Sequence, residues 1–273
     1  MSRAYRYGFI GCGNMGSAML GGILNSKIAR KGEIIASCHS KETKHRIEQD
    51  YGIAVTVDNT EVVENSDMII FAVKPYQLDI ILPQLHGHFK KDQVIVSVAA
   101  GKAMDTIEQS LISIEVAGHL KVARAMPNTP ALVGEAMSAV SFNDKMTETD
   151  QEAVVAVFQS FGKAEVVPET LMDVVTGVSG SSPAFIYMII EAMADAAVSE
   201  GMPRSQAYTF AAQSVLGSAK MVLTTGKHPG ELKDAVCSPN GTTIAGVMAL
   251  EEDGLRATVM NGICAAVDRS REM

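Results

Sequence analysis

The sequence has no excess of basic residues. Its 23 Lys and Arg side chains are outnumbered by 31 Asp and Glu side chains, which gives a formal net charge of −8. A protein that binds nucleic acid usually carries clustered positive charge, because the phosphates that it contacts have to be neutralised. The charge balance therefore gives no support to a role in binding DNA or RNA.

The sequence also lacks any pattern of closely spaced cysteines. Its four cysteines are far apart, with no CxxC pair and no histidine-rich neighbourhood, and they are Cys12, Cys38, Cys237 and Cys264. Zinc sites and thiol–disulfide motifs normally show such close spacing. We therefore expect no metal site, and we expect the cysteines to be small buried thiols in a reducing compartment.

No long uninterrupted apolar segment is present either. The most apolar segment, SPAFIYMIIEAMADAAVSEG, is interrupted by Glu191 and Asp195. It falls short of the roughly 18 consecutive apolar residues that suggest a membrane span. The N-terminal residues MSRAYRYGFIG lead directly into a strand pattern, without the apolar core and cleavage site of a signal peptide. We expect a soluble cytoplasmic protein that does not contact membranes.

What the sequence does contain, up to about residue 163, is an alternation of short β-branched segments with helical ones. The expected strands are YRYGFI, EIIASC, IAVTV, DMIIFAV, QVIVSVAA, LKVARAM and EAMSAVSF. Most of them are too apolar to have a face in water, which indicates parallel strands covered by helices on both sides. We predict an α/β Rossmann domain, a doubly wound and mostly parallel sheet, over residues 1–163.

Strand patterns disappear after about residue 169, and only helices are expected from there on. Their expected ranges are 170–177, 181–200, 204–224, 229–236, 242–252 and 255–271. The segment 184–198 is methionine-rich and apolar around nearly its whole circumference, so it has to be covered on all sides. We predict an all-α dimerisation domain over residues 164–273, which buries this helix in a homodimer or a larger assembly of dimers.

A glycine motif lies in GFIGCGNMGSAML, where Gly11, Gly13 and Gly16 form GxGxxG. The motif stands between a strand ending at Ile10 and a helix beginning near Met15. In a βαβ unit this spacing allows a tight turn, close approach of a pyrophosphate and close packing of helix on strand. We predict a dinucleotide site formed by Gly11, Cys12, Gly13, Asn14, Met15 and Gly16.

The end of the second expected strand, ASCHSKETKHR, has no acidic residue at the position that would bind the ribose of NAD. It offers hydroxyl and cationic groups instead, which suit a 2′-phosphate, and these are His39, Ser40, Lys41, Lys44 and Arg46. The alternative is a helix start whose lysines merely face water. We predict NADPH as the cofactor, with NADH possible.

Further candidate residues follow other expected strands. Ligands of open α/β sheets bind outside the carboxyl ends of the strands. The residues expected at that edge are Asn59, Val73, Lys74, Pro75, Ala99, Ala100, Gly101 and Asn128. Pro75 is also explained as the residue that ends its strand.

The segment SPNGTT interrupts the helical half at residues 238–243. Proline and Asn-Gly favour a break, and the helix pattern resumes directly afterwards. The break is either a plain connector or a helix N-terminus that holds an anion. In the second case Gly241 provides space, and Thr242 and Thr243 offer hydroxyls beside free N–H groups.

Residues that could act as a strong base are missing from the start of the helical half. TGVSGSSPAFIYMIIEA contains neither Lys nor His, and His228 in GKHPGEL is expected to be a turn or cap at a helix start. Oxidation of an alcohol needs a base to remove the hydroxyl proton. The composition favours reduction of a C=N bond, because an imine is protonated far more readily than a ketone.

Together, GFIGCGNMG, AVKP, VSVAAG, RAMPNTPALVGEA, GSSPAF and HPGELKDAVCSPNGTTIAGVMALEEDG resemble the pyrroline-5-carboxylate reductase family over essentially the whole chain. The resemblance implies a Rossmann domain followed by a helical dimerisation domain whose helices interlock between subunits. It also implies reduction of Δ1-pyrroline-5-carboxylate to L-proline by NAD(P)H, the last step of proline biosynthesis.

The resemblance assigns roles to the candidate residues. The pyrophosphate would lie at Gly11 to Gly16, the adenosine end at Ser40 and Asn59, and the nicotinamide side at Val73, Lys74, Ala99, Ala100 and Asn128. Ser238, Gly241, Thr242 and Thr243 would bind the substrate carboxylate, and Thr243, near the ring nitrogen, would be the catalytic residue. The chain departs from the family pattern at Ser182 and at Asn240, where glycine is frequent. Asparagine tolerates the left-handed conformation, so we expect the turn at Asn240 to be kept.

Two other functions remain open at this stage. One is an NADP oxidoreductase like the β-hydroxyacid dehydrogenases, which share the two-part layout but carry a lysine on the first long helix of the second domain. The expected helix here has no lysine. The other is a non-catalytic NADP sensor, which would need GxGxxG but would have no use for an anion site.

Overall fold

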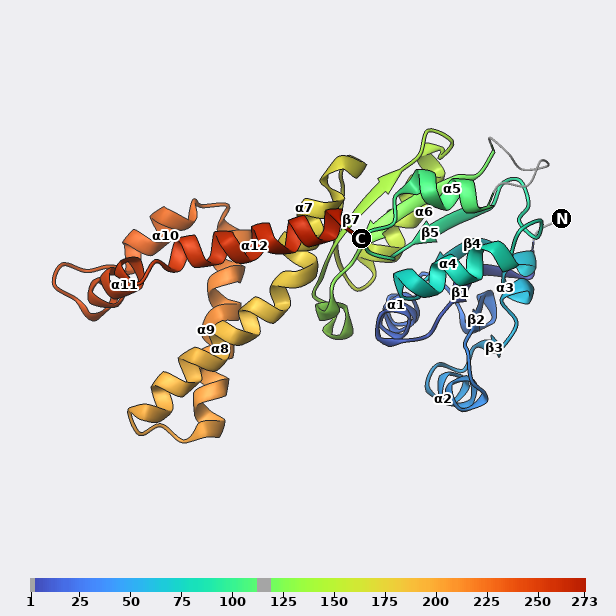
Figure 1. The fold of residues 1–273 in the computed structure, drawn as a ribbon. Coiled ribbons are helices and arrows are strands. Elements are labelled where there is room, and N and C mark those ends of the chain that lie inside the picture. The colour runs from blue at the N-terminus through green and yellow to red at the C-terminus, as the bar shows by residue number, and fades with distance from the viewer. Residues whose placement is uncertain (1–2, 112–118) are drawn as a thin grey trace. The chain divides into compact units, whose positions relative to one another are not determined.

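The computed structural model describes residues 3–111 and 119–273 (Figure 1). The chain divides into two compact units. Unit 1 comprises the chain up to Ser181 together with Ala266–Met273, and unit 2 comprises Ser182–Ala265. The predicted boundary between residues 163 and 164 lies inside a strand of unit 1, β8 (Gly162–Val166).

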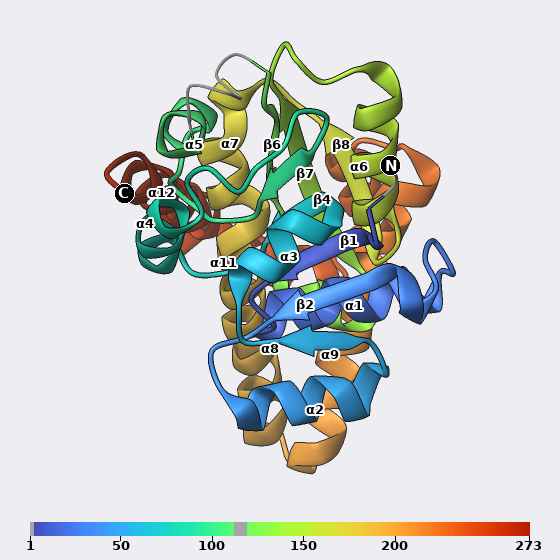
Figure 2. The same cartoon turned by 90° about the vertical axis from the view of Figure 1, so that its right-hand side faces the viewer.

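Unit 1 is built on an eight-stranded sheet with the order β3-β2-β1-β4-β5-β6-β7-β8. In Figure 2, β2, β1 and β4 follow one another in this order. Every neighbouring pair is parallel except β6 with β7. The strands are β1 (Tyr5–Ile10), β2 (Ile34–Ser37), β3 (Ala54–Thr56), β4 (Ser66–Phe71), β5 (Val94–Ser97), β6 (Lys121–Met126), β7 (Ala136–Phe142) and β8. The strand order reverses between β1 and β4, which confirms the predicted doubly wound, mostly parallel sheet.

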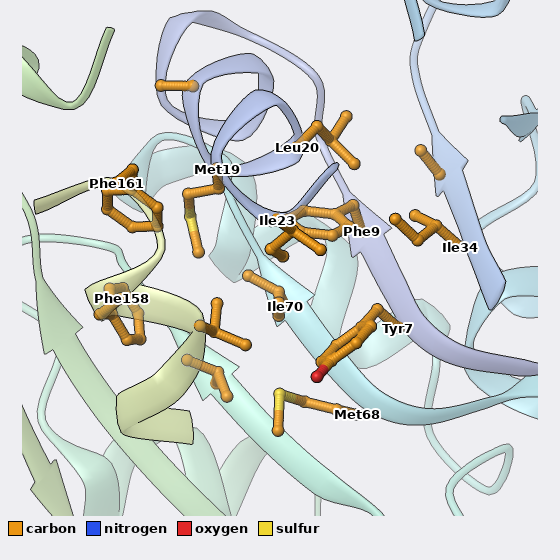
Figure 3. Packing of buried hydrophobic residues seen from close by; sticks show 14 of the residues in the cluster. Tyr7, Phe9, Met19, Leu20, Ile23, Ile34, Met68, Ile70, Phe158 and Phe161 are labelled. Atoms are coloured by element: carbon orange, nitrogen blue, oxygen red, sulfur yellow. The ribbon is translucent and has the colours of Figure 1, made fainter. Parts of the chain in front are cut away.

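Helices cover both faces of the sheet. One core contains side chains of α1 (Asn14–Asn25), α2 (Lys41–Tyr51) and α6 (Glu148–Gln159). The opposite core contains side chains of α3 (Asn59–Asn65), α4 (Pro75–Gln84) and α5 (Met104–Leu111). Successive residues of β1 show the alternation, since Phe9 enters the first core and Ile10 the second. Figure 3 shows Phe9 beside Ile23 of α1 in the first core.

The sequence predicts a helix from about Thr147 to Phe161, with TETD as the capping signature at its start and Gly162 as the residue that ends it. These two local predictions have different outcomes. The TETD segment does begin α6, because the Asp150 amide donates to Thr147 Oγ1 and the Thr147 amide donates to Asp150 Oδ2. Gly162, however, does not end that helix. It opens β8, a strand that the sequence did not predict, and a Cβ at Gly162 would lie 2.2 Å from the Ala136 carbonyl oxygen. β8 is an edge strand with Lys163 and Glu165 exposed, so it lacks an apolar pattern.

The helices after β8 agree closely with their predicted ranges. A short 3₁₀ turn η3 (Glu169–Leu171), α7 (Met172–Val175) and a π-helical turn η4 (Thr176–Ser181) belong to unit 1. They are followed by α8 (Ser182–Ser199), α9 (Arg204–Thr225), α10 (Pro229–Val236), α11 (Thr242–Glu252) and α12 (Leu255–Arg271). In unit 2, α8 and α9 pack against each other (Figure 1).

Most of α8 is not covered by its own chain. Ala194 is its only buried residue, and the large side chains Ile186, Tyr187, Met188, Ile189 and Met193 are exposed. The helical stretch Glu169–Ser199 is long and apolar enough to cross a membrane, judged by length and composition alone. A helix that is covered by a second subunit meets the same criterion. The exposed apolar face therefore requires a covering partner, as the sequence predicts.

Candidate active site

Two glycines of the GxGxxG loop are required by the chain itself. Gly11 has a φ of 97°, and its amide donates to the Ser37 carbonyl at 3.1 Å. A Cβ at Gly11 would lie 2.7 Å from the Ala72 carbonyl oxygen, and a Cβ at Gly16 would lie 2.3 Å from the Gly11 carbonyl oxygen. Gly11 thus permits the tight turn and Gly16 the close packing of α1 on that turn.

Gly13 differs from these two, because a Cβ added there would meet nothing within 4 Å. It is the N-cap of α1, where no side chain makes a capping hydrogen bond and the first turn contains no acidic residue. The first amide groups of a helix have no partner inside the helix, and they favour an anion. The open space before Gly13 and this helix N-terminus fit the pyrophosphate of a dinucleotide.

The other residues of the loop have distinct environments. Asn14 is exposed at the first position of α1, whereas Met15 packs against the first core. Cys12 is buried, and its thiol donates to the Ser37 carbonyl at 3.6 Å. Burial and then the neighbouring Cys38 raise the pKa of Cys12 to about 12. Cys12 is therefore a neutral thiol that packs inside the loop.

The predicted burial of the other cysteines is only partly correct. Cys38 is buried, and burial raises the pKa of its thiol, which donates to the Ser40 carbonyl at 3.4 Å. Cys237 is half-buried and Cys264 is exposed in the single chain. The prediction is wrong for Cys264 because it lies on α12, whose helical face is open in the single chain. Within residues 3–111 and 119–273, no group of three or more His, Cys, Asp or Glu side chains could hold a metal ion.

The residues after β2 lie next to the glycine loop. Ser40 is the N-cap of α2, where its Oγ accepts the Thr43 amide at 3.1 Å. Lys41 is exposed at the first position of that helix. Arg46, one turn further on, donates from Nη2 to the Cys12 carbonyl at 3.5 Å. Arg46, one of the cations predicted for a 2′-phosphate, thus contacts the loop predicted for the pyrophosphate. Lys44 instead lies 3.6 Å from Glu48.

Asn59 is also near this group. It is the first residue of α3, and its Oδ1 accepts the Ser37 hydroxyl at 2.6 Å. Because the Ser37 carbonyl accepts the Gly11 amide, Ser37 connects Asn59 to the glycine loop.

The loops after β4 and β5 lie beside the loop after β1. The Ala72 amide donates to the Ile10 carbonyl at 2.9 Å, and the Val98 amide donates to the Phe71 carbonyl at 3.1 Å. Val73 is so near that a Cβ on Gly11 would lie 2.5 Å from its Cγ1. The carboxyl ends of three adjacent strands therefore form one edge, as predicted.

The remaining residues of this edge lie either at the start of α4 or in the loop of small residues after β5. Lys74 is the exposed N-cap of α4, and Pro75 is its first residue, where proline is favoured because no amide partner is needed. Ala99 is buried, Ala100 is half-buried, and Gly101 adopts a φ of 70°. Pro75 thus starts a helix, and it does not end the strand, because β4 already ends at Phe71.

Asn128 has a structural task that the sequence did not indicate. Its side chain is 9% exposed, its Nδ2 donates to the Ser179 carbonyl at 3.0 Å, and its Oδ1 accepts the Met137 amide at 3.0 Å. It therefore ties the segment after β6 to β7 and to η4. A contact of Asn128 with the cofactor stays a prediction.

In unit 2, the SPNGTT segment forms a sharp turn into α11. Asn240 adopts the left-handed conformation with a φ of 55°, as expected for the residue that replaces a glycine. Gly241 is the N-cap of α11, and its amide donates to the Ser238 carbonyl at 3.0 Å. A Cβ at Gly241 would lie 2.3 Å from Ser238 Oγ, so a side chain there would have to displace the Ser238 hydroxyl.

The start of α11 has the properties of an anion site. No side chain makes a capping hydrogen bond at Gly241, and no acidic residue lies in the first turn of the helix. Ser238, Thr242 and Thr243 are exposed in the single chain. The first amide groups of α11, its dipole and two threonine hydroxyls can therefore meet a carboxylate.

His228, the histidine of the helical half, acts as a cap. It is the N-cap of α10, and its Nδ1 accepts the Gly230 amide at 3.1 Å. This is the turn or cap expected from the sequence. The ring nitrogen that a general base would use is engaged in this hydrogen bond.

Sequence reasoning missed an ion-pair group in unit 1. Arg124 on β6 is buried, and its Nη1 lies 3.3 Å from Glu169 Oε1. Its Nη2 lies 4.0 Å from Asp173 Oδ1. The available signal was the charged residue inside the otherwise apolar segment LKVARAM, because a buried charge needs a partner.

Two models of known protein families match different parts of the chain. A model of the pyrroline-5-carboxylate reductase dimerisation domain matches residues 169–273. A model described as NADP oxidoreductase coenzyme F420-dependent matches residues 6–101.

Individual relatives match from end to end. Pyrroline-5-carboxylate reductase of Escherichia coli is 47% identical over 98% of this chain and 98% of its own, and that of Methanosarcina acetivorans is 46% identical over 98% and 97%. The crystal structure of Plasmodium falciparum pyrroline carboxylate reductase with NADP bound superposes with a TM-score of 0.87 at 30% identity, covering 100% of this chain and 99% of that one. With these relatives and the two units described above, the chain belongs to the pyrroline-5-carboxylate reductase family.

Proposed function

We propose that this protein reduces Δ1-pyrroline-5-carboxylate to L-proline, with NADPH as the preferred hydride donor and NADH as a possible one. The observation that carries the proposal is the 47% identity to the Escherichia coli reductase along 98% of both chains. The reaction converts the imine, a hydride and a proton into the secondary amine of proline. It is an oxidoreductase step that ends proline biosynthesis.

The residues of unit 1 fit an NADP cofactor. The pyrophosphate would be held by the loop from Gly11 to Gly16, because the space before Gly13 is open and the start of α1 is uncapped. Ser40, Lys41 and Arg46 would hold the 2′-phosphate, and Arg46 already reaches the loop. The edge residues Asn59, Val73, Lys74, Pro75, Ala99, Ala100, Gly101 and Asn128 would line the rest. When bound, the cofactor supplies the hydride.

The start of α11 is proposed to hold the substrate. Its first amide groups would bind the carboxylate, together with Ser238, Gly241, Thr242 and Thr243. The Thr243 hydroxyl would hydrogen-bond the ring nitrogen and hold the proton there. Fixing both ends of a small ring orients its imine carbon, and orientation contributes much of the rate in a transfer between two bound molecules.

The absence of a strong acid or base from the helical half supports an imine substrate. TGVSGSSPAFIYMIIEA contains no Lys or His, and the Nδ1 of His228 accepts the Gly230 amide. An imine nitrogen is basic enough to take its proton from water before hydride arrives. The iminium N–H can then donate to the Thr243 hydroxyl oxygen, and no stronger acid is needed, whereas oxidation of a hydroxy acid would need a base.

The match to a dimerisation domain supports self-association of the chain. We propose a homodimer, alone or as the unit of a larger assembly, in which the exposed side chains of α8 are covered by the partner. This arrangement explains the long apolar stretch Glu169–Ser199 without a membrane, and we propose a cytoplasmic location.

A coupled assay tests the proposal. Purified protein is mixed with NADPH and pyrroline-5-carboxylate, and the NADPH consumed is compared with the proline formed. Equal amounts are expected. Oxidation of 3-hydroxy acids with NADP⁺, and no reduction of the imine, would indicate the dehydrogenase alternative. Binding of NADPH without consumption would indicate the sensor.

A further inference from the structure

The loop between β5 and α5 contains only small residues at the predicted nicotinamide side, and it is held from outside. The Met104 amide, at the first position of α5, donates to Glu169 Oε1 at 2.7 Å. A first-turn amide has no partner inside its helix, so this carboxylate from η3 acts as a long-range cap, and its negative charge favours the helix N-terminus. Glu169 thus fixes the point where the loop enters α5.

The same loop also touches the last turn of the chain. A Cβ added at Gly101 would lie 2.6 Å from Met273 Cβ. The Met273 amide donates to the Ser270 carbonyl at 3.3 Å, which ties that contact to the end of α12. These residues belong to unit 1, although α12 begins at Leu255 in unit 2.

A line of polar contacts connects the Glu169 cap of α5 with the end of α12. Ser270 Oγ donates to Asp173 Oδ1 at 2.7 Å, and Asp173 lies 4.0 Å from the Arg124 guanidinium. Arg124, whose side chain is 9% exposed, lies 3.3 Å from Glu169 Oε1. The line therefore runs from the end of α12 through a buried arginine on β6 to the first amide of α5.

We infer that this line, which we name the C-terminal brace (Arg124, Glu169, Asp173 and Ser270), positions the loop of residues 98–104 for hydride transfer. The four are positioning residues, since they act on the loop and not on the reacting atoms. The role of the loop at the nicotinamide rests on the proposed function.

The start of the loop is held by the Val98 amide, which donates to the Phe71 carbonyl at 3.1 Å. Lys102 pairs with Asp79 at 2.9 Å on the far side of Gly101. The brace adds the hold at the Met104 amide and so fixes where the loop enters α5.

The inference has a kinetic consequence. Transfer between two bound molecules is sensitive to their geometry, and a displacement of about 1 Å can cost about a hundredfold in rate. Cutting the brace is therefore expected to lower kcat by about ten- to a hundredfold, with a smaller change in the KM for NADPH, because the pyrophosphate loop is not part of the brace.

The test combines hydrogen exchange with kinetics. Glu169→Ala removes the acceptor of the Met104 amide, Glu169→Gln keeps an acceptor oxygen, and Ser270→Ala cuts the line at its far end. Glu272→Ala is the matched control, because its carboxylate pairs only with the exposed Arg269 in the described structure. In Glu169→Ala, exchange at residues 98–104 should be at least about tenfold faster, while exchange in β1 stays unchanged.

Glu169→Gln should restore most of the protection and of kcat, and Ser270→Ala should show a smaller change in the same direction. The inference is overturned if exchange at residues 98–104 equals that of Glu272→Ala, or if β1 loses protection to the same degree, since that is a general loss of stability. Exchange is measured without substrate. It therefore tests the C-terminal brace even if the wild-type protein does not reduce pyrroline-5-carboxylate. That second result would refute the proposed function separately.

Discussion

Gly13→Ala separates the cofactor role of the glycine loop from its structural role. The φ of Gly13 is −74°, which alanine adopts without strain, and an added Cβ meets nothing within 4 Å. Fewer unfolded conformations stabilise the variant by about 0.4–1 kcal/mol, and the poorer N-cap costs a similar amount. The free energy of unfolding should therefore stay within about 1 kcal/mol of wild type.

The same methyl group should weaken NADPH binding, because it enters the space proposed for the pyrophosphate. Inserting a methylene into a filled site costs about 1–3 kcal/mol, which is about 5- to 150-fold in Kd. Calorimetry gives the Kd, and chemical denaturation gives the stability. Gly32→Ala is the control, since its Cβ also meets nothing but lies outside the loop. Wild-type affinity in Gly13→Ala would refute the pyrophosphate assignment.

Four further changes have expected outcomes. Ser40→Asp should shift kcat/KM from NADPH toward NADH, because a carboxylate repels a 2′-phosphate; an unchanged ratio would disprove the role of that loop. Thr243→Val removes one hydrogen bond of about 1.5–3 kcal/mol, so kcat/KM should fall about ten- to a hundredfold with unchanged NADPH binding. Burial and then Cys38 raise the pKa of Cys12 to about 12. The pKa of Cys12 in the folded protein is above the unfolded value of about 8.5, so the thiol's contribution to the free energy of unfolding is present below about pH 8.5 and is lost toward about pH 12. In alkaline denaturation, the free energy of unfolding of Cys12→Ala should therefore fall less steeply with pH than that of the wild type. Met188→Glu places a charge on the exposed apolar face of α8, so light scattering should show a smaller assembly, and an unchanged size would exclude this face from the interface.

Sequence patterns predict the fold where the local signal and the tertiary environment agree. The strands β1 to β6 consist mainly of buried apolar residues, and the helices from α8 to α12 have clear breaks between them. β8 could not be predicted, because an edge strand with Lys163 and Glu165 exposed has no apolar pattern and depends on pairing with β7. The prediction that Gly162 ends a helix was wrong because glycine is needed there for a long-range contact, the close approach of the Ala136 backbone.

The site was predictable to the extent that it uses backbone geometry. Glycines in a turn and a helix start leave a local signature, as at Gly11, Gly13 and Gly241. Contacts between distant segments leave none. The hydrogen bonds of Asn128 to Ser179 and the cap that Glu169 provides for α5 join residues 51 and 65 positions apart. Such long-range contacts became visible only in the folded chain.

The transfer of deuterium tests the central claim most directly, because it follows the hydride itself. NADPH that carries deuterium at both C4 positions is incubated with the protein and pyrroline-5-carboxylate, and the product is analysed by mass spectrometry and NMR. The account predicts L-proline with one deuterium on C5, the former imine carbon, and an equal amount of NADP⁺. Proline without deuterium, or consumption of NADPH without proline, would contradict it.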